Sequence, residues 1–230
     1  MSRKDEIRNA YRHMGGDHDF YDGMITCSTL SGRLVTRAVW AMSEEENHEY
    51  IAKAMQGIPE GFAGRLLEVP VGTGILTMPL YKTLPEADVT CLDYSADMMA
   101  RAQKRAEGMG LCNVYFQQGD VGALPYEDGS FDTVLSLNGF HAFPDKEAAY
   151  RETFRVLAPG GTFCGCFYIA GQHKRTDWFV NHLYVPKGYF TPPFETLESL
   201  RNRLEGMYAN VKIETVKGIA CFTCTKGVTV

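Results

Sequence analysis

Short apolar runs alternate with segments of helical spacing over most of the chain. The runs that predict strands span residues 66–69, 88–92, 113–116, 131–137, 162–168, 211–216 and 219–225. The segments in which apolar residues recur every three or four positions predict helices at 74–84, 95–106, 145–157 and 196–207. Such alternation is typical of βαβ units, so we expect an α/β fold with a doubly wound, mostly parallel sheet and helices on both faces.

Two regions depart from this alternation. Ser43, followed by three glutamates, has the spacing of a capping box and predicts a helix to about Met55. We expect residues 1–60 to form a helical cover on the carboxyl edge of the sheet, and residues 61–230 to form a Rossmann-like domain. Residues 170–195 are rich in aromatic side chains and long for a connection after the fifth strand, which predicts a lid or a small helical insertion.

Composition narrows the possible functions. The chain has 230 residues, 45% of them hydrophobic, which suffices for one sizeable core, and its net charge of -5 argues against a nucleic-acid binder. No apolar run approaches the roughly 20 residues that span a bilayer, and the first residues lack an apolar signal segment. Seven scattered cysteines indicate free thiols in a reducing cytoplasm rather than a metal site, so we expect a cytoplasmic protein.

The stretch LLEVPVGTGILTMPL, from Leu66 to Leu80, contains a candidate ligand site. Gly72 and Gly74 follow a predicted strand, at the sheet edge where ligands of doubly wound folds bind, and a helix expected from Gly74 would offer free N–H groups. No lysine follows the glycines, which argues against a nucleoside triphosphate. Thr77 at the third GxGxxG position, with the charge of Glu68 nearby, argues against a pyrophosphate. A cationic, phosphate-free nucleoside such as S-adenosylmethionine fits better.

Two further acids stand at predicted strand ends. Asp93 follows the second strand, where a carboxylate can accept hydrogen bonds from both ribose hydroxyls. Asp120 lies in Gly119-Asp120-Val121 after the third strand, where it can bind the adenine amino group while Val121 offers an N–H and an apolar wall. Three acids, each at a strand end, indicate a site for one adenosine with a positively charged tail.

These segments resemble the class I S-adenosylmethionine-dependent methyltransferases, most closely the small-molecule branch that includes the quinone C-methyltransferases. The resemblance covers about residues 60–168, and its carriers are LLEVPVGTG, DYSADMMARA, GDVGALPYEDGSFD and RVLAPGG. It implies a seven-stranded sheet with an antiparallel last strand, S-adenosylmethionine as cofactor, S-adenosylhomocysteine as product and a small-molecule methyl acceptor. The chain departs from the family at Pro70, which replaces the usual first glycine.

The resemblance also implies roles for single residues. The glycine loop would lie under the methionine end of the cofactor, Tyr94 and Met98 beside the adenosine, and Asn138 opposite the methionine amine. Tyr21 matches a position where an N-terminal aromatic residue closes over the cofactor, with ordinary core packing as the alternative. The full set expected to bind the cofactor is Tyr21, Glu68, Val69, Pro70, Gly72, Gly74, Asp93, Tyr94, Met98, Gly119, Asp120, Val121 and Asn138.

His141 is the candidate catalytic residue. It lies three positions after Asn138, at a strand end that often carries substrate-facing groups, and it is either a general base for in-line methyl transfer or a polar packing residue. Aromatic residues in the cover and the insertion indicate a flat or apolar acceptor. Two other functions stay open, a nicotinamide-dependent reductase and a non-catalytic S-adenosylmethionine binder. The sequence does not identify the acceptor, the methylated atom or the oligomeric state.

Overall fold

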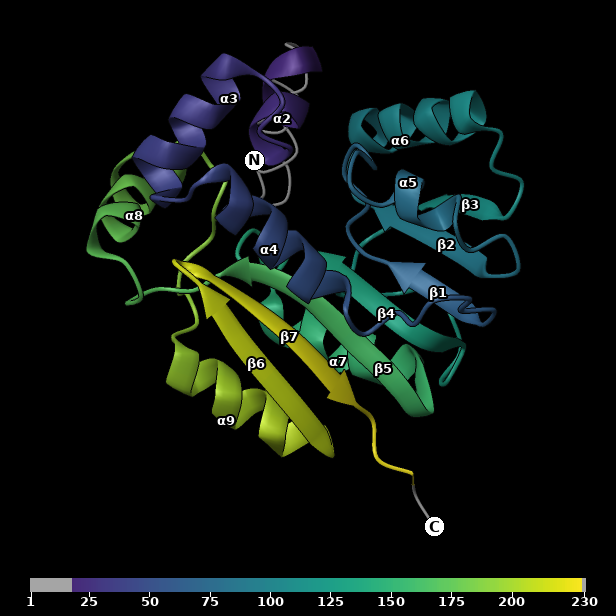
Figure 1. Ribbon diagram of the computed structural model, residues 1–230. Helices are drawn as coiled ribbons and strands as arrows, with labels where there is room; N and C mark the ends of the chain where they lie inside the picture. Colours follow the sequence, from purple (N-terminus) through teal and green to yellow (C-terminus); the bar gives the residue numbers. More distant parts are fainter. Residues whose placement is uncertain (1–17, 229–230) are drawn as a thin grey trace.

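A computed structural model describes residues 18–228. Its centre is a seven-stranded sheet with the strand order β3-β2-β1-β4-β5-β7-β6, in which β7 runs opposite to the other six strands. Figure 1 shows this twisted sheet crossing the molecule. The strands are β1 Arg65–Glu68, β2 Asp88–Asp93, β3 Val114–Gln118, β4 Phe131–Leu137, β5 Leu157–Tyr168, β6 Asn210–Val216 and β7 Ile219–Thr225. The predicted fold class is therefore confirmed, including the antiparallel last strand.

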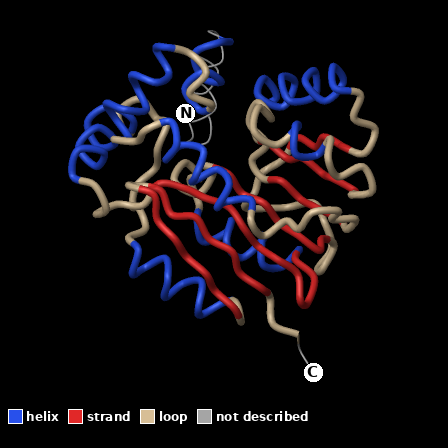
Figure 2. Tube along the Cα trace, viewed as in Figure 1, coloured by secondary structure: helices blue, strands red, loops and turns tan. Residues whose placement is uncertain are grey.

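Helices cover both faces of the sheet (Figure 2). Each face has its own hydrophobic core. One core receives side chains from α4 (Glu44–Met55), α5 (Met78–Tyr81) and α6 (Ala96–Met109). The other receives side chains from α7 (Lys146–Val156) and α9 (Leu197–Met207). Because β1 and β4 are buried between the two cores, their sequences are apolar on both faces, which makes them easy to predict.

The N-terminal helices and the insertion after β5 lie together at the carboxyl ends of the parallel strands (Figure 1). The N-terminal elements are α2 (His18–Ile25), α3 (Leu30–Val35) and the π-helical turn η1 (Thr36–Trp40); the insertion contains α8 (Lys174–Phe179) and η2 (Val180–Tyr184). The Thr176 hydroxyl of α8 donates to the Val39 carbonyl of η1 at 2.8 Å. Residues 1–17 of the predicted cover lie outside the described residues, and the division of the chain at residue 60 remains a prediction.

The helix predicted over residues 74–84 is wrong in its start. The residues after Gly74 form turns, and α5 begins only at Met78. Pro79 explains the late start, because proline has no N–H and fits only the first turn of a helix. The free N–H groups expected of a helix at Gly74 are therefore not those of a helix N-terminus.

The predicted start of α4 is confirmed, whereas the start of β5 differs from the prediction. Ser43 and Glu46 form both hydrogen bonds of the predicted capping box. β5 begins at Leu157 rather than at the predicted Thr162, because Leu157 already pairs with Phe131 of β4 before a register shift. Within residues 18–228, no helix has the length and apolar character needed to cross a membrane.

Candidate active site

A cleft at the carboxyl ends of β1, β2 and β4, termed the cofactor cleft, encloses about 1100 Å³ together with the open space at its mouth. Its walls include every residue predicted to bind the cofactor: Tyr21, Glu68, Val69, Pro70, Gly72, Gly74, Asp93, Tyr94, Met98, Gly119, Asp120, Val121 and Asn138. The structure thus brings together residues from five separate parts of the chain, while their roles toward a ligand remain predictions. Ile25, Ala142 and Phe143 also line the cleft, but they are apolar residues without a distinctive motif and were not predicted from the sequence.

The glycine loop is fixed by the end of β2. Asp93 accepts hydrogen bonds from the Gly72 N–H and the Ser95 N–H, both at 2.8 Å, one on each carboxylate oxygen. The N–H of Val71 donates to the Leu92 carbonyl at 3.0 Å. A carboxylate has about four lone-pair sites, so beyond the backbone N–H groups of Gly72, Ser95 and Tyr94 Asp93 retains acceptor capacity for a ligand in the cleft.

Pro70 leaves this loop firmly anchored. The residues on either side of it use their N–H groups, Val69 toward the Leu135 carbonyl at 2.9 Å and Val71 toward that of Leu92 at 3.0 Å. The Pro70 ring instead packs where a Cβ on Gly139 would lie, 2.5 Å from that position. Replacing the usual glycine by proline therefore removes neither of these two anchors and joins the loop to the end of β4.

The two glycines are required for different reasons. Both have a positive φ, of +56° at Gly72 and +66° at Gly74. A Cβ on Gly72 would meet nothing within 4 Å, so the space beside it is open to a ligand. A Cβ on Gly74 would lie 3.0 Å from Met78 and 3.2 Å from Ala102. Gly74 therefore permits close packing of the loop on α6, whereas Gly72 faces the cofactor cleft.

Glu68 is buried, with 1% of its surface exposed. It accepts a hydrogen bond from the Tyr81 hydroxyl at 2.8 Å and lies 3.6 Å from the Cys91 sulfur. Burial is the main cause that raises the pKa of Glu68 to about 8, and burial likewise raises the pKa of Asp93 to about 6. At neutral pH Glu68 is mostly protonated until a cation approaches, because a nearby positive charge lowers the pKa of a carboxyl group.

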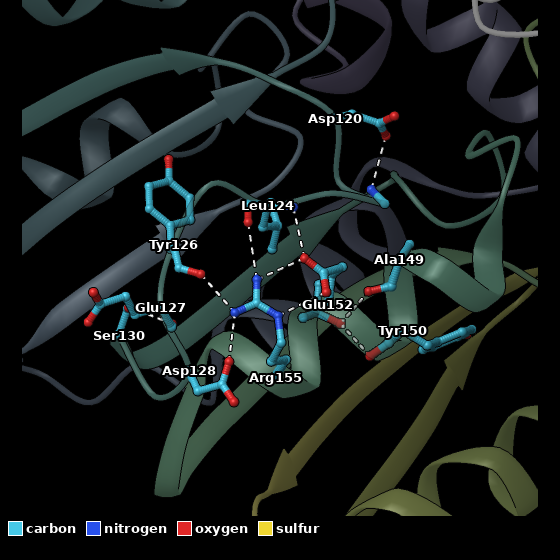
Figure 3. Close-up of polar contacts among 12 residues, drawn as sticks. Asp120, Leu124, Tyr126, Glu127, Asp128, Ser130, Ala149, Tyr150, Glu152 and Arg155 are labelled. Carbon is cyan, nitrogen blue, oxygen red and sulfur yellow. Dashed lines mark hydrogen bonds and ion pairs between the residues drawn. The ribbon is translucent and has the colours of Figure 1, made fainter.

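The loop that carries Asp120 is held by Arg155 (Figure 3). Asp120 itself accepts a hydrogen bond from the Gly122 N–H at 3.0 Å. The Arg155 guanidinium donates to the Leu124 and Tyr126 carbonyls at 3.1 and 2.7 Å. Its ion pairs with Glu152 and Asp128, at 2.8 Å each, hold it in place. α7 therefore positions the segment expected to meet the adenine.

A second cavity, termed the aromatic pocket, adjoins the cofactor cleft and encloses about 670 Å³ with the space at its mouth. Its walls are Tyr21, Met24, Ile25, Thr36, Trp40, Met42, Asn47, Tyr50, Asn138, His141, Tyr184, Tyr189, Phe190 and Ile219. Tyr21, Ile25 and Asn138 line both cavities. Asn138 adopts φ +55°, a conformation uncommon for residues other than glycine, and its N–H donates to the Cys166 carbonyl at 2.7 Å.

His141 belongs to the aromatic pocket, not to the cofactor cleft. Its ring stacks on Phe190, with centroids 3.8 Å apart, and its Nδ1 accepts a hydrogen bond from the Tyr168 N–H at 3.1 Å. Burial, and then the charge of Lys146, lowers the pKa of His141 to about 3. The ring is therefore neutral, and because Nδ1 is the acceptor, the proton resides on Nε2.

Within residues 18–228 no group of three side chains is arranged to hold a metal ion. The strand cysteines Cys164, Cys166, Cys221 and Cys224 are buried, and none forms a disulfide. They contribute to the two cores as small apolar side chains.

Residues 66–161 match the family model described as a methyltransferase domain. The demethylmenaquinone methyltransferase of Thermus thermophilus is 44% identical over 97 residues, which cover 42% of this chain and 44% of that protein. The phosphatidylethanolamine N-methyltransferase of Cereibacter sphaeroides is 34% identical over 154 residues, which cover 66% of this chain and 67% of that protein. The chain belongs to the class I S-adenosylmethionine-dependent methyltransferases. The family assignment does not favour a nicotinamide-dependent reductase.

The chain spans about half the length of several of the curated relatives that it matches, so their individual reactions do not transfer with the family. The fold also matches that of phosphoethanolamine N-methyltransferase 2 of Haemonchus contortus, in complex with phosphomonomethylethanolamine and S-adenosylhomocysteine. That likeness has a TM-score of 0.68 at 15% identity, over 88% of this chain and 59% of that one, and shows the fold alone.

S-adenosylmethionine is the cofactor of this methyltransferase family, and the cofactor cleft fits it. The cleft offers an acceptor carboxylate at Asp93, open space beside Gly72 for close backbone approach, and the buried acid Glu68 for a cationic tail. Among residues 18–228 no basic side chain lines the cleft, and α5 begins too late to offer a helix N-terminus at Gly74, so neither of the usual partners of a pyrophosphate is found there.

Proposed function

We propose that this methyltransferase transfers the methyl group of S-adenosylmethionine to a small, flat, largely apolar acceptor held in the aromatic pocket. The observation that carries this proposal is the shared wall of Tyr21, Ile25 and Asn138, which joins the aromatic pocket to the cofactor cleft. A methyl donor in the cleft and an acceptor in the pocket would then meet beside these three side chains.

The chemistry of the pocket supports an oxygen-bearing aromatic ring as acceptor, such as a phenol or a reduced quinone. Six of the described wall residues are aromatic and none is acidic. Flat apolar rings stack well against such walls. The Nε2–H of His141 would add one hydrogen-bond donor, which suits a phenolic or quinone oxygen and disfavours an ammonium group.

The residues of the protein would contribute alignment, exclusion of water and one fixed donor. S-adenosylmethionine, when bound, supplies an electrophilic methyl carbon on a positively charged sulfur. Asp93 and the glycine loop would hold the adenosine part, and the aromatic walls would hold the acceptor in line with the methyl group. The neutral His141 would donate from Nε2 to the oxygen of an acceptor bound as its phenolate, after the phenolic proton has passed to solvent, and would stabilise the negative charge on that oxygen until the methyl group is transferred. His141 would therefore act as a donor, which differs from both roles considered from the sequence, a general base and a polar packing residue.

An assay with labelled S-adenosylmethionine and a set of acceptors tests this proposal. We expect product with hydroxylated aromatic rings, and none with amines of the ethanolamine type. If only amines are methylated, the proposed acceptor class is wrong, although the protein would still be a methyltransferase. If the protein binds S-adenosylhomocysteine but methylates no acceptor in a cell extract, the non-catalytic alternative is correct.

A further inference from the structure

We propose that this methyltransferase docks on an anionic bilayer surface through one exposed face of α3, η1, α8 and η2, termed the docking face. Six large apolar side chains are exposed among the described residues, and four of them lie on these elements: Leu30, Leu34, Trp178 and Leu183. Their exposed fractions are 79%, 69%, 53% and 39%. Scattered exposed apolar residues are normal, but a cluster confined to neighbouring elements indicates an interaction surface.

The elements that carry the four side chains lie next to one another, because η1 and α8 contact each other directly. The Arg175 guanidinium donates to the Arg37 carbonyl at 2.7 Å, so α8 lies against η1, the turn that continues α3 (Figure 1). Leu34 precedes Arg37 by three positions and Trp178 follows Arg175 by three. Leu34 and Trp178 therefore lie about one helical turn, and Leu30 and Leu183 about two turns, from the point where the two elements meet.

The charge of the docking face favours an anionic bilayer as the occupant. Residues 30–41 and 171–190 contain the bases Arg33, Arg37, Lys174, Arg175 and Lys187 against a single acid, Asp177, whereas the whole chain has a net charge of -5. Asp177 accepts hydrogen bonds from Tyr168 and Gly171.

Arg33 pairs with Glu44 at 3.5 Å, but no ion pair links the other four bases to an acid within residues 18–228. Exposed leucines and a tryptophan flanked by such unpaired bases are typical of elements that lie in a lipid interface.

The docking face adjoins the aromatic pocket. η1 and η2 carry the docking face on their outer sides, and the same turns contribute Trp40 and Tyr184 to the pocket walls. Docking would therefore place the pocket next to the bilayer, where an apolar acceptor dissolves. This consequence rests on the proposed function, whereas the docking itself does not.

Flotation of the full chain with lipid vesicles tests the docking directly. We expect binding to vesicles of phosphatidylcholine mixed with phosphatidylglycerol, little binding to phosphatidylcholine alone, and weaker binding as salt is raised. The double variant Trp178→Ser/Leu183→Ser should reduce the bound fraction about tenfold, because it removes two interfacial side chains. Lys174→Glu/Lys187→Glu should abolish the preference for phosphatidylglycerol. Tyr115→Ser is the matched control, because Tyr115 is 58% exposed on β3, away from the docking face.

Binding of S-adenosylhomocysteine, measured by calorimetry without vesicles, should be the same in all these variants and shows that each is folded. The proposal is wrong if the wild-type chain does not float, or if Tyr115→Ser weakens flotation as much as the double variant. It is also wrong if sedimentation shows a dimer that the double variant dissociates while vesicles stay unbound, since a second copy would then cover the face. Methylation of a water-soluble phenol without vesicles tests the proposed function separately.

Discussion

The carboxylate of Asp22 accepts a hydrogen bond from the Thr73 hydroxyl at 2.6 Å and so joins α2 to the glycine loop. Its other oxygen pairs with Arg105 of α6 at 2.8 Å, and Arg105 also donates to the Thr73 carbonyl at 3.3 Å. α2 carries Tyr21 and Ile25, which line the cofactor cleft. The contacts of Asp22 therefore hold a wall of the cleft in place over the loop.

Replacing Asp22 with alanine should loosen this wall and weaken cofactor binding. The Asp22 side chain is 16% exposed, so its pair with Arg105 is stronger than a surface ion pair. We expect S-adenosylhomocysteine to bind about tenfold more weakly, mainly through faster dissociation, which stopped-flow measurements would resolve. Glu44→Ala, which removes the exposed pair with Arg33, is the control and should leave the dissociation rate unchanged. Equal rates in wild type and Asp22→Ala would show that the contact does not hold the cleft closed.

Replacing Gly72 with alanine should mainly weaken cofactor binding, whereas replacing Gly74 with alanine should mainly lower folding stability. At Gly72 the new Cβ enters open space, so the variant should lose only about 1 kcal/mol of folding stability from its positive φ but bind the cofactor poorly. At Gly74 the Cβ meets Met78 and Ala102, which should lower the free energy of unfolding by about 1–3 kcal/mol more. Thermal unfolding and calorimetry on both variants would check this, and the assignment fails if the Gly72 variant binds the cofactor as the wild type does.

Asp93→Asn tests the proposed ribose contact. Asparagine has one acceptor oxygen, so its NH₂ group would face either the Gly72 N–H or the Ser95 N–H, where the carboxylate now accepts both. We expect cofactor binding to weaken by roughly 100-fold, from lost charged hydrogen bonds and a displaced loop. Because the pKa of Asp93 is raised to about 6 by burial, wild-type affinity should also increase as pH rises through 6. An affinity that Asp93→Asn leaves unchanged would remove Asp93 from the site.

Much of the fold and of the candidate site could be predicted from local sequence signals. The buried strands are continuous apolar runs, and acids or glycines follow them at the edge where β1, β2 and β3 end, so topology alone gathers Glu68, Asp93 and Asp120 near one cleft. The burial and pKa of each carboxyl group could not be predicted in this way, because they depend on side chains that are distant in sequence. Tyr81 and Cys91 enclose Glu68, and no local pattern indicates this contact.

The start of α5 and the setting of His141 were missed for physical reasons of two kinds. The apolar spacing of residues 74–84 predicts a helix from Gly74. Pro79 is a local signal for a later start, because proline fits only the first turn of a helix. His141 depends on long-range contacts, since Phe190 and the Tyr168 N–H come from the insertion and from β5. Spacing along the chain places His141 at a strand end but does not determine which ring nitrogen carries the proton.

The raised pKa of Glu68 makes a prediction about stability. In the unfolded chain this carboxyl loses its proton near pH 4.5, whereas in the folded protein it keeps the proton to about pH 8. Its contribution therefore favours folding below pH 4.5 and is lost as pH rises to 8. We expect Glu68→Gln to be more stable than the wild type at pH 9. The free energy of unfolding of the variant minus that of the wild type should be about 2–4 kcal/mol greater at pH 9 than at pH 4. Denaturant unfolding at the two pH values measures this, and parallel pH profiles would contradict it.

The same carboxyl group should release a proton when the cationic cofactor binds. A sulfonium or ammonium near Glu68 lowers its pKa, so near pH 7 a fraction of a proton should leave on binding. Calorimetry in buffers of different ionisation enthalpy counts that proton. We expect more release with S-adenosylmethionine than with S-adenosylhomocysteine, which lacks the sulfonium charge, and much less from the Glu68→Gln variant. Equal release from variant and wild type would assign the proton to another group.

His141 can be tested as a donor against its role as a general base by the pH dependence of the rate. A base with an ordinary histidine pKa would cause the rate to fall on the acid side of about pH 6.5. The pKa of about 3 predicts no such limb for His141 anywhere above pH 4. His141→Phe should preserve the stack on Phe190 but lose the Nε2–H, lowering kcat about 10- to 100-fold without changing the affinity for S-adenosylhomocysteine. His141→Gln, whose amide can still donate, should recover part of the rate. A limb near pH 6.5 that disappears in His141→Phe would instead identify His141 as the base.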